Sequence, residues 1–111
     1  MRMWNVDPTM LCTQHLLGEH LEMHMFRGTI VRGRSIDGFI RNGLVETGRI
    51  VERHDVLAME MARRGMNHKS PLEQFDVEAR GSVDVRQNEA ELASRCFLCR
   101  RRLEGGRNES A

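Results

Sequence analysis

The spacing of apolar residues along the chain predicts helices and no strand. Asp7 followed by Pro8 is typical of an N-cap and a first helical turn, and we expect this helix to run to about Met25. One of its sides is apolar and is expected to face the core, with Met10, Leu11, Leu17, Leu21 and Met25 on it.

Two more helices are predicted in the same way. The second spans about 50–64, and Gly65 is placed to end it in the left-handed conformation. Its apolar stripe consists of Ile50, His54, Leu57, Ala58 and Met61. Ser82 can cap a third helix that runs to about Leu103. The stripe of this helix consists of Val85, Leu92, Cys96, Cys99 and Leu103.

Residues 27–49 are predicted to form a long loop rich in glycine and arginine. Glycine recurs there at every fifth position, but the residues between the glycines do not repeat. The segment contains only two acidic residues, Asp37 and Glu46, but five arginines: Arg27, Arg32, Arg34, Arg41 and Arg49. It is either a solvated loop or an arm that contacts phosphates, since glycine lets the backbone approach a ligand closely.

The predicted fold is therefore all-α: a compact single domain of three helices over 1–103, followed by a disordered tail at 104–111. No apolar run is long enough for a transmembrane helix, and no apolar signal core stands at the N-terminus. We expect an intracellular protein, in the cytoplasm of the host or producing cell, with no membrane partner.

Charge and composition narrow the chemistry. The formal net charge is +1, so a nucleic-acid site would have to be a local basic patch. Sixteen of the 17 basic residues are arginine and one is lysine, Lys69. Arginine keeps its charge, whereas lysine can lose its proton and attack a carbonyl. Lysine chemistry is therefore limited to one side chain.

Cysteine and histidine offer candidate metal ligands. Cys96 and Cys99 form a CxxC motif, and Cys12 with His15 could supply the other two ligands of a structural zinc ion. The alternatives are buried thiols or a redox role, since three cysteines make no disulfide framework. His20 and His24 are spaced to chelate, but they lie on the polar flank of their helix and are expected to face solvent or phosphate. No cofactor is predicted.

The order of residues in two segments resembles a known family. Gln14 to Glu22 is similar to the first helix of the phage endonuclease V family, the pyrimidine-dimer DNA glycosylases. Arg53 through Lys69, with Arg64-Gly65-Met66-Asn67, resembles that family's second helix and its exit. Met1 also falls at a matching distance from Glu22. The resemblance covers 1–26 and 50–72.

The resemblance implies a helical enzyme with both glycosylase and abasic-site lyase activity on double-stranded DNA. It implies that the α-amine of Met1 is the nucleophile and that Glu22 is the essential carboxylate. Arg2, Gln14 and His15 would contact DNA. The two basic zones, 27–49 and 95–102, add further candidate phosphate contacts, namely Arg32, Arg34, Arg100 and Arg101.

Three departures from the family bear on the substrate. Arg2 should keep Met1 in place, where the family presents a processed, smaller residue. Leu21 stands where the family has an arginine. The sequence contains no tyrosine, so the family's aromatic-rich tail is missing. A pyrimidine dimer, an abasic site, another lesion or a modified base all suit these residues.

Two other classes of function remain. A non-catalytic DNA-binding protein would need the arginine-rich loop and Arg100–Arg102, but not Glu22. A zinc-stabilised interaction module or a metal-dependent nuclease would instead use the cysteines with His15, or the histidine pair.

Overall fold

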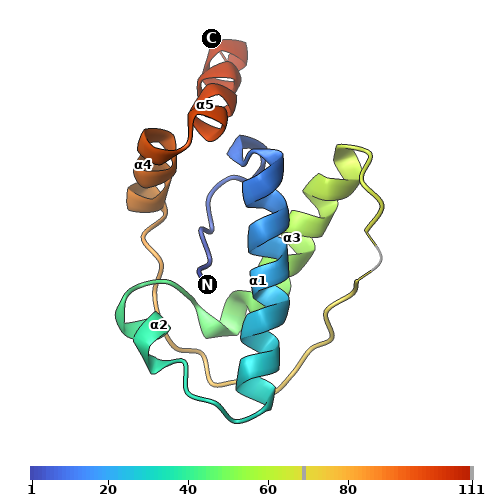
Figure 1. The fold of residues 1–111 in the computed structure, drawn as a ribbon, viewed down its shortest axis with the longest axis vertical. Helices are drawn as coiled ribbons and strands as arrows, with labels where there is room; N and C mark the ends of the chain where they lie inside the picture. Colours follow the sequence, from blue (N-terminus) through green and yellow to red (C-terminus); the bar gives the residue numbers. More distant parts are fainter. Residues whose placement is uncertain (69, 111) are drawn as a thin grey trace.

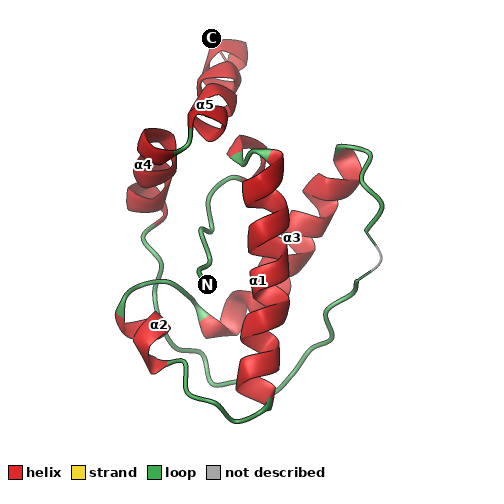
Figure 2. Ribbon diagram, viewed as in Figure 1, coloured by secondary structure: helices red, strands yellow, loops and turns green. Residues whose placement is uncertain are grey.

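The computed structural model describes residues 1–68 and 70–110, and every regular element in this part of the chain is helical (Figure 2). Lys69 lies outside the described residues. The predicted all-α class is confirmed, but the three predicted helices are replaced by five. The elements are η1 (Pro8–Met10), α1 (Thr13–Val31), α2 (Asp37–Arg41), η2 (Thr47–Arg49), α3 (Ile50–Arg63), α4 (Val85–Arg95) and α5 (Phe97–Ser110).

Helix α1 begins and ends later than the sequence predicts. Asp7 caps only the short turn η1, where the Thr9 amide donates to its carboxylate at 2.9 Å. The chain is then extended at Leu11 and Cys12, and Cys12 is the N-cap of α1. The helix passes the predicted end at Met25 and stops before Gly33, whose φ of 75° ends it in the left-handed region.

The buried face of α1 is not the predicted one. Leu17, Leu21 and Met25 are 42%, 59% and 46% exposed. The core side carries Leu16, Glu19, His20, Met23 and Phe26. The prediction was wrong because two of the buried residues are polar, so the pattern of apolar residues alone pointed to the wrong side.

Helix α3 and its end are confirmed. The helix spans Ile50–Arg63, and Gly65 adopts a φ of 81° immediately after it. The backbone amides of Arg64 and Gly65 donate to the last carbonyls of the helix, which is the arrangement expected of a glycine stop. Helices α1 and α3 pack on each other and cross at the centre of the molecule (Figure 1).

The predicted loop and the predicted third helix both differ in detail. The segment 27–49 includes the end of α1, helix α2 and the turn η2. The third helix is broken into α4 and α5 at Cys96, whose backbone is extended with φ −123° and ψ 108°. Helix α5 continues to Ser110, through the segment where a disordered tail was expected, and the division of the chain at residue 103 stays a prediction.

A buried ion pair joins the N-terminal segment to both central helices. Arg53 of α3 donates to Glu19 of α1 at 2.6 Å from Nε and at 2.9 Å from a terminal nitrogen. The same Glu19 carboxylate accepts from the backbone amides of Trp4 (3.1 Å) and Asn5 (3.3 Å). Arg53 also donates to the carbonyl of Val6 at 2.8 Å. Every charged group of the pair therefore has a hydrogen-bond partner.

Further contacts hold the N-terminal segment on its other sides. The Met3 amide donates to the carbonyl of Leu44 at 2.6 Å, and the buried side chain of Asn88 on α4 donates to the carbonyl of Trp4 at 2.9 Å. The N-terminus lies between α1, α2 and α4 (Figure 1). Chain ends usually fray, so this one is unusually well anchored.

The long segment between α3 and α4 wraps around the lower end of the helix pair (Figure 1). Thr47 anchors it: its hydroxyl donates to the carbonyl of Glu78 at 2.6 Å and its amide donates to the carbonyl of Arg80 at 2.9 Å. Gly81, with φ 89°, sits where a Cβ would lie only 2.2 Å from the Val45 carbonyl oxygen. No helix in the described part of the chain has the length and apolar character needed to cross a bilayer.

We expect Glu19→Ala to lower the free energy of unfolding by about 3–5 kcal/mol, because it leaves the Arg53 guanidinium buried without a counter-charge. Urea denaturation measures this change. Glu104→Ala is the matched control, since Glu104 is exposed on α5 and should shift stability by less than about 0.5 kcal/mol. Similar stabilities for the two variants would contradict the structural role of the pair.

Candidate active site

Met1 and Glu22 lie together beside the N-terminal segment. The Arg2 backbone amide donates to Glu22 Oε2 at 3.2 Å. Only the Cα and carbonyl carbon of Met1 separate that amide from the Met1 α-amine, so the amine is close to the carboxylate. Both residues are half-buried, which leaves the pair open to a ligand. The structure thus brings together the two residues that the resemblance singles out, and their catalytic roles stay predictions.

The Arg2 side chain is held within the protein. Its guanidinium lies 3.7 Å from the centroid of the Trp4 ring. It donates to Asn88 at 2.8 Å and forms an ion pair with Glu91 at 2.9 Å, both on α4. Sequence reasoning missed Asn88 and Glu91, because nothing in a local pattern links α4 to a residue at the other end of the chain. Contact of Arg2 with DNA remains a prediction.

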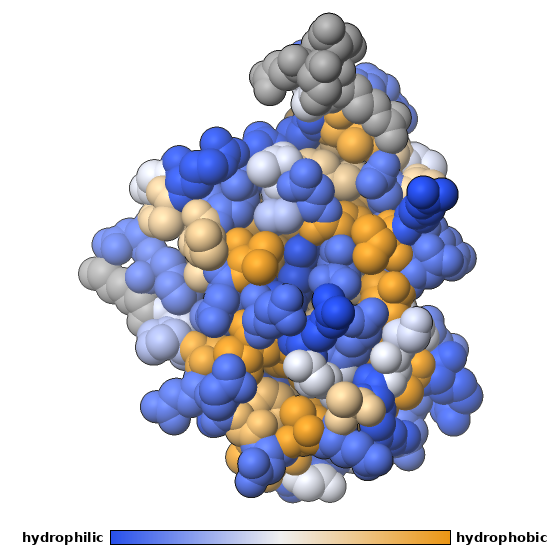
Figure 3. Space-filling view, turned by 180° about the vertical axis from the view of Figure 1, so that it is seen from behind, coloured by the Kyte–Doolittle hydropathy of each residue, from blue (hydrophilic) through white to orange (hydrophobic). Residues whose placement is uncertain are grey.

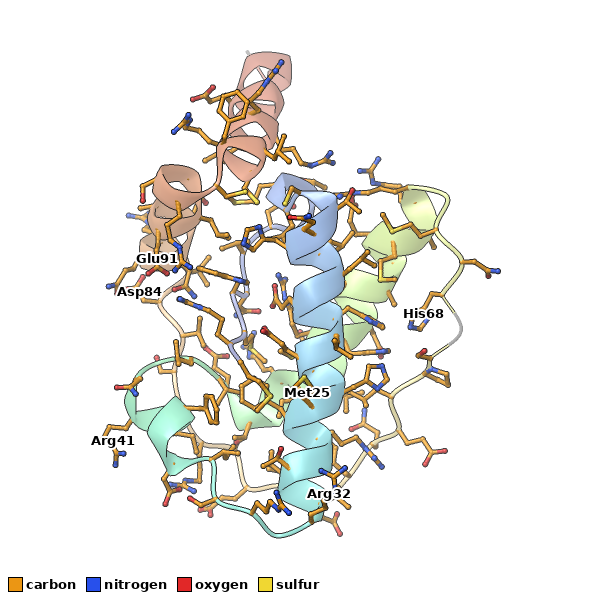
Figure 4. The ribbon with its side chains drawn as sticks, in the orientation of Figure 1. Met25, Arg32, Arg41, His68, Asp84 and Glu91 are labelled. Atoms are coloured by element: carbon orange, nitrogen blue, oxygen red, sulfur yellow. The ribbon has the colours of Figure 1, made fainter. Side chains whose placement is uncertain are left out.

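An exposed apolar stripe runs along α1 next to Glu22. It consists of Leu17, Leu21 and Met25, the residues that were predicted to be core. Met25 is labelled on the front of α1 in Figure 4. The face behind α1 is mostly hydrophilic, with apolar atoms in separate patches (Figure 3). The surface beside Glu22 therefore offers apolar contact to a bound group.

Two of the predicted DNA contacts share one groove. Gln14 at the start of α1 and Arg101 on α5 line a hollow of about 390 Å³, together with Thr13, Leu98 and Arg102. Arg100 is not among the residues that line this hollow, although the guanidinium groups of Arg100 and Arg101 both lie near the Phe97 ring, 5.4 Å and 5.9 Å from its centroid. The structure thus gathers part of the 95–102 zone beside the first turn of α1.

The other basic zone lies elsewhere. Arg32 and Arg34 are exposed beyond the far end of α1, and Figure 4 shows Arg32 there. Arg34 lines a groove that also contains Asp37, Asp76 and Glu78. Arg80 lines the same groove and forms an ion pair with Asp37 at 3.1 Å. The two basic zones therefore lie at opposite ends of α1, with Arg101 beside its first turn and Arg32 beyond its last.

The candidate metal ligands at the two ends of the chain come together. Cys12, His15, Cys96 and Cys99 place their ligand atoms all within 4.8 Å of one another. His15 Nδ1 lies 3.2 Å from the sulfur of Cys12 and 3.5 Å from that of Cys99, so this nitrogen faces thiols. Burial raises the pKa of the Cys99 thiol to about 12.

Four histidines form a second cluster, on the side of α1 away from Glu91 (Figure 4). His20 and His24 of α1 meet His54 of α3 and His68, with ring centroids 4.6 to 5.2 Å apart. The expectation that His20 and His24 face solvent or phosphate was wrong: His20 is buried and His24 half-buried. Their spacing was visible in the sequence, but the partners on other segments were not.

Two of these histidines, His20 and His24, have a pKa below the ordinary value, and burial is the largest cause for both. Burial, followed by the neighbouring His54, His68 and His24, lowers the pKa of His20 to about 4. Ring nitrogens of His20, His54 and His68 lie within 4.8 Å and could approach a metal. However, both nitrogens of His54 are engaged, with the Ser70 carbonyl and the Asp55 carboxylate, each at 2.9 Å.

The chain matches a known protein family. Residues 1–74 match the family model described as pyrimidine dimer DNA glycosylase. The matched region is 74 of the 111 residues, contains Met1, Glu22 and every element from η1 to α3, and ends before α4 and α5. No curated protein and no solved structure matched the chain.

We expect stability to fall in mild acid because of His20. Below its ordinary pKa of 6.5 and down to about 4, the unfolded chain binds a proton at this position that the folded protein does not bind. The free energy of unfolding should therefore drop as the pH falls through this window, by about 3 kcal/mol. Chemical denaturation at a series of pH values measures it. His20→Phe keeps a ring at this position and should flatten the dependence; an unchanged slope would rule out His20 as its source.

Proposed function

Because the chain belongs to the pyrimidine dimer DNA glycosylase family, we propose that it excises a base from damaged or modified duplex DNA and then cleaves the strand as an abasic-site lyase. The family indicates DNA glycosylase activity and a DNA substrate. The observation that carries the finer proposal is the hydrogen bond from the Arg2 amide to Glu22, which fixes the N-terminal residue beside a carboxylate.

The first step is nucleophilic attack by the Met1 α-amine. α-Amino groups are much weaker bases than lysine side chains, so a larger fraction is neutral and nucleophilic near pH 7. The amine nitrogen forms a bond to C1′ of the deoxyribose, and the bond from C1′ to the base breaks. The electron pair leaves with the base, which takes up a proton. Glu22 would stabilise the positive charge that develops on the sugar.

The second step cleaves the strand. The nitrogen loses a proton and its electron pair forms the C1′=N bond as the C1′–O4′ bond breaks; O4′ takes that bond's electrons and a proton, which leaves a protonated imine between Met1 and C1′. The imine makes the C2′ proton acidic. A base removes that proton, the electrons form a C2′–C3′ double bond, and the 3′ phosphate leaves. Glu22 accepts a hydrogen bond from the Arg2 amide, the peptide group next to Met1, which suits this carboxylate to transfer these protons.

The rigid setting of the N-terminus supports this chemistry. Glu19 and Arg53 hold the backbone of Trp4, Asn5 and Val6 from one side. Asn88 holds the Trp4 carbonyl from another. An amine that is already ordered loses less entropy when it reaches the transition state, and this ordering contributes to the rate.

DNA would bind across the surface that carries Glu22. The exposed stripe of Leu17, Leu21 and Met25 gives apolar contact beside the reacting carboxylate, and apolar side chains are used by other proteins to open base steps. Gln14 and Arg101 line the groove at one end of α1, while Arg32 and Arg34 are exposed at its other end. We assign phosphate contacts to these arginines.

Borohydride should trap a covalent adduct between the protein and duplex DNA that contains an abasic site or a pyrimidine dimer. The imine forms on Met1, so peptide mass mapping should locate the adduct at the N-terminal peptide. A protein whose α-amine is blocked by acetylation should give no adduct. Lys69→Ala is the control and should trap as well as the unmodified chain; loss of trapping in this variant alone would contradict the role of Met1.

Glu22→Gln should lower the rate of nicking at abasic sites by about 10²–10⁴-fold, because the carboxylate that stabilises charge and transfers protons is gone. A gel assay under single-turnover conditions measures the rate, and fluorescence anisotropy should show DNA binding of similar affinity. Glu52→Gln, an exposed position on α3, is the matched control. Unchanged nicking in Glu22→Gln would favour the alternative, a non-catalytic DNA-binding protein on this scaffold.

A further inference from the structure

The chain's three cysteines and His15 converge from opposite ends of the sequence. Cys12 and His15 stand at the start of α1, while Cys96 and Cys99 stand at the break between α4 and α5. We propose that these four residues bind one structural Zn²⁺ ion per chain, with three sulfurs and one imidazole nitrogen as ligands.

The distances between the ligand atoms suit a tetrahedral zinc ion. Zinc bonds of about 2.3 Å to sulfur and 2.0–2.1 Å to nitrogen imply ligand atoms about 3.8 Å apart for two sulfurs and about 3.5 Å apart for sulfur and nitrogen. The Cys12 and Cys96 sulfurs are 3.9 Å apart. His15 Nδ1 lies 3.2 Å and 3.5 Å from the sulfurs of Cys12 and Cys99.

Backbone amides are arranged to stabilise negative charge on each sulfur. The Cys12 amide donates to the Cys99 sulfur at 3.2 Å, the Cys99 amide to the Cys96 sulfur at 3.4 Å, and the His15 amide to the Cys12 sulfur at 3.5 Å. Cys12 and Cys96 also immediately precede α1 and α5, whose N-terminal ends favour negative charge. Metal-bound cysteines are thiolates, and such hydrogen bonds are typical of their surroundings.

The convergence of the three sulfurs and the His15 ring is not needed if the cysteines are only buried core residues. Free cysteines pack as small apolar residues and have no need to turn their sulfurs toward one another or toward an imidazole. Here the helix is interrupted at Cys96, and the interruption lets Cys96 and Cys99 face the same point. The Cys12 and Cys96 sulfurs are not bonded to each other, because their separation of 3.9 Å is well beyond the disulfide bond length of about 2.05 Å.

The donor set favours zinc at this cluster over a metal at the histidines. Thiolates with imidazole form closed four-ligand sites that select zinc. In the histidine cluster, by contrast, the Ser70 carbonyl and the Asp55 carboxylate already engage both nitrogens of His54. The cysteine site offers four protein ligands, and a zinc ion with four protein ligands is typical of a structural site.

The zinc ion would connect the family region to the rest of the chain. Cys12 and His15 lie inside the matched residues 1–74, whereas Cys96 and Cys99 lie beyond them. Helix α4 ends at the site and supplies Asn88 and Glu91 to Arg2. The ion would thus fix α4 and α5 against the N-terminal segment, away from the reacting carboxylate.

Metal analysis of the full chain, purified without chelator, tests the proposal. We expect about one zinc per chain, and replacement by Co²⁺ should give a thiolate-to-cobalt charge-transfer band. Titration with an organomercurial should release the zinc as the three thiols react. Less than about a tenth of an equivalent of zinc with no cobalt–thiolate band, iron in place of zinc, or a Cys12–Cys96 disulfide seen by mass spectrometry would each overturn it.

Variants localise the ion and separate it from catalysis. Cys96→Ser should lower zinc content and zinc affinity by at least tenfold, and His20→Phe, in the other cluster, should keep the full equivalent. Zinc lost from His20→Phe but kept in Cys96→Ser would overturn the assignment. Glu22→Gln should retain zinc while it loses nicking, so failure of the zinc site and failure of the proposed lyase chemistry give different results. If Cys96→Ser does not fold, the mercurial titration of the unmodified chain tests the cysteine ligands instead. Zinc that stays bound after all three thiols have reacted would overturn the proposal.

Discussion

The buried ion pair between Glu19 and Arg53 is the interaction on which the rest of the structure depends. Burying two charges is costly unless every donor and acceptor is satisfied, and here the remaining capacity of the pair is filled by the backbone of Trp4, Asn5 and Val6. The pair therefore does more than join α1 to α3. It makes the docking of the N-terminal segment a condition for burying the charges, so the helix pair and the ordered N-terminus form together.

A second group of charged residues, Glu60 with Arg63 and Arg64, holds the backbone that leads into α1. Hydrogen bonds from Arg63, and then from Arg64, outweigh burial and lower the pKa of Glu60 to about 2. Arg64 reaches on to the carbonyls of Pro8 (3.2 Å) and Leu11 (2.7 Å). This contact fixes the turn that leads into Cys12. The N-terminal twelve residues are thus positioned by α3 at two points, one near the candidate nucleophile and one near the cysteines.

The sequence predicts those features of the fold that depend on contacts between neighbouring residues, and it misses those that depend on residues far apart in the chain. Local signals were sufficient for α3, where apolar spacing and Gly65 agree with the structure. The buried side of α1 was misassigned because Glu19 is buried only by virtue of Arg53, which a one-helix pattern does not contain. The break in the third predicted helix at Cys96 was missed for the same reason. The Cys96 sulfur faces the sulfur of Cys12, which is far away in the sequence. Met1 and Glu22 were predicted from the family resemblance rather than from periodicity, and the structure brings them together, while their catalytic roles stay predictions.

Trp4 links the candidate active site to the cysteine cluster. Its buried ring has the Arg2 guanidinium 3.7 Å from the centroid, and it meets the edge of the His15 ring at a centroid distance of 6.0 Å. Arg2 carries the amide that binds Glu22, and His15 faces the sulfurs. Because packed interiors leave little free volume, a shift of α4 or of the cysteines must move this ring or open a gap around it. The C-terminal helices, which lie outside the family region, can therefore influence the geometry around Met1 through this ring, in addition to the phosphate contact proposed for Arg101 of α5.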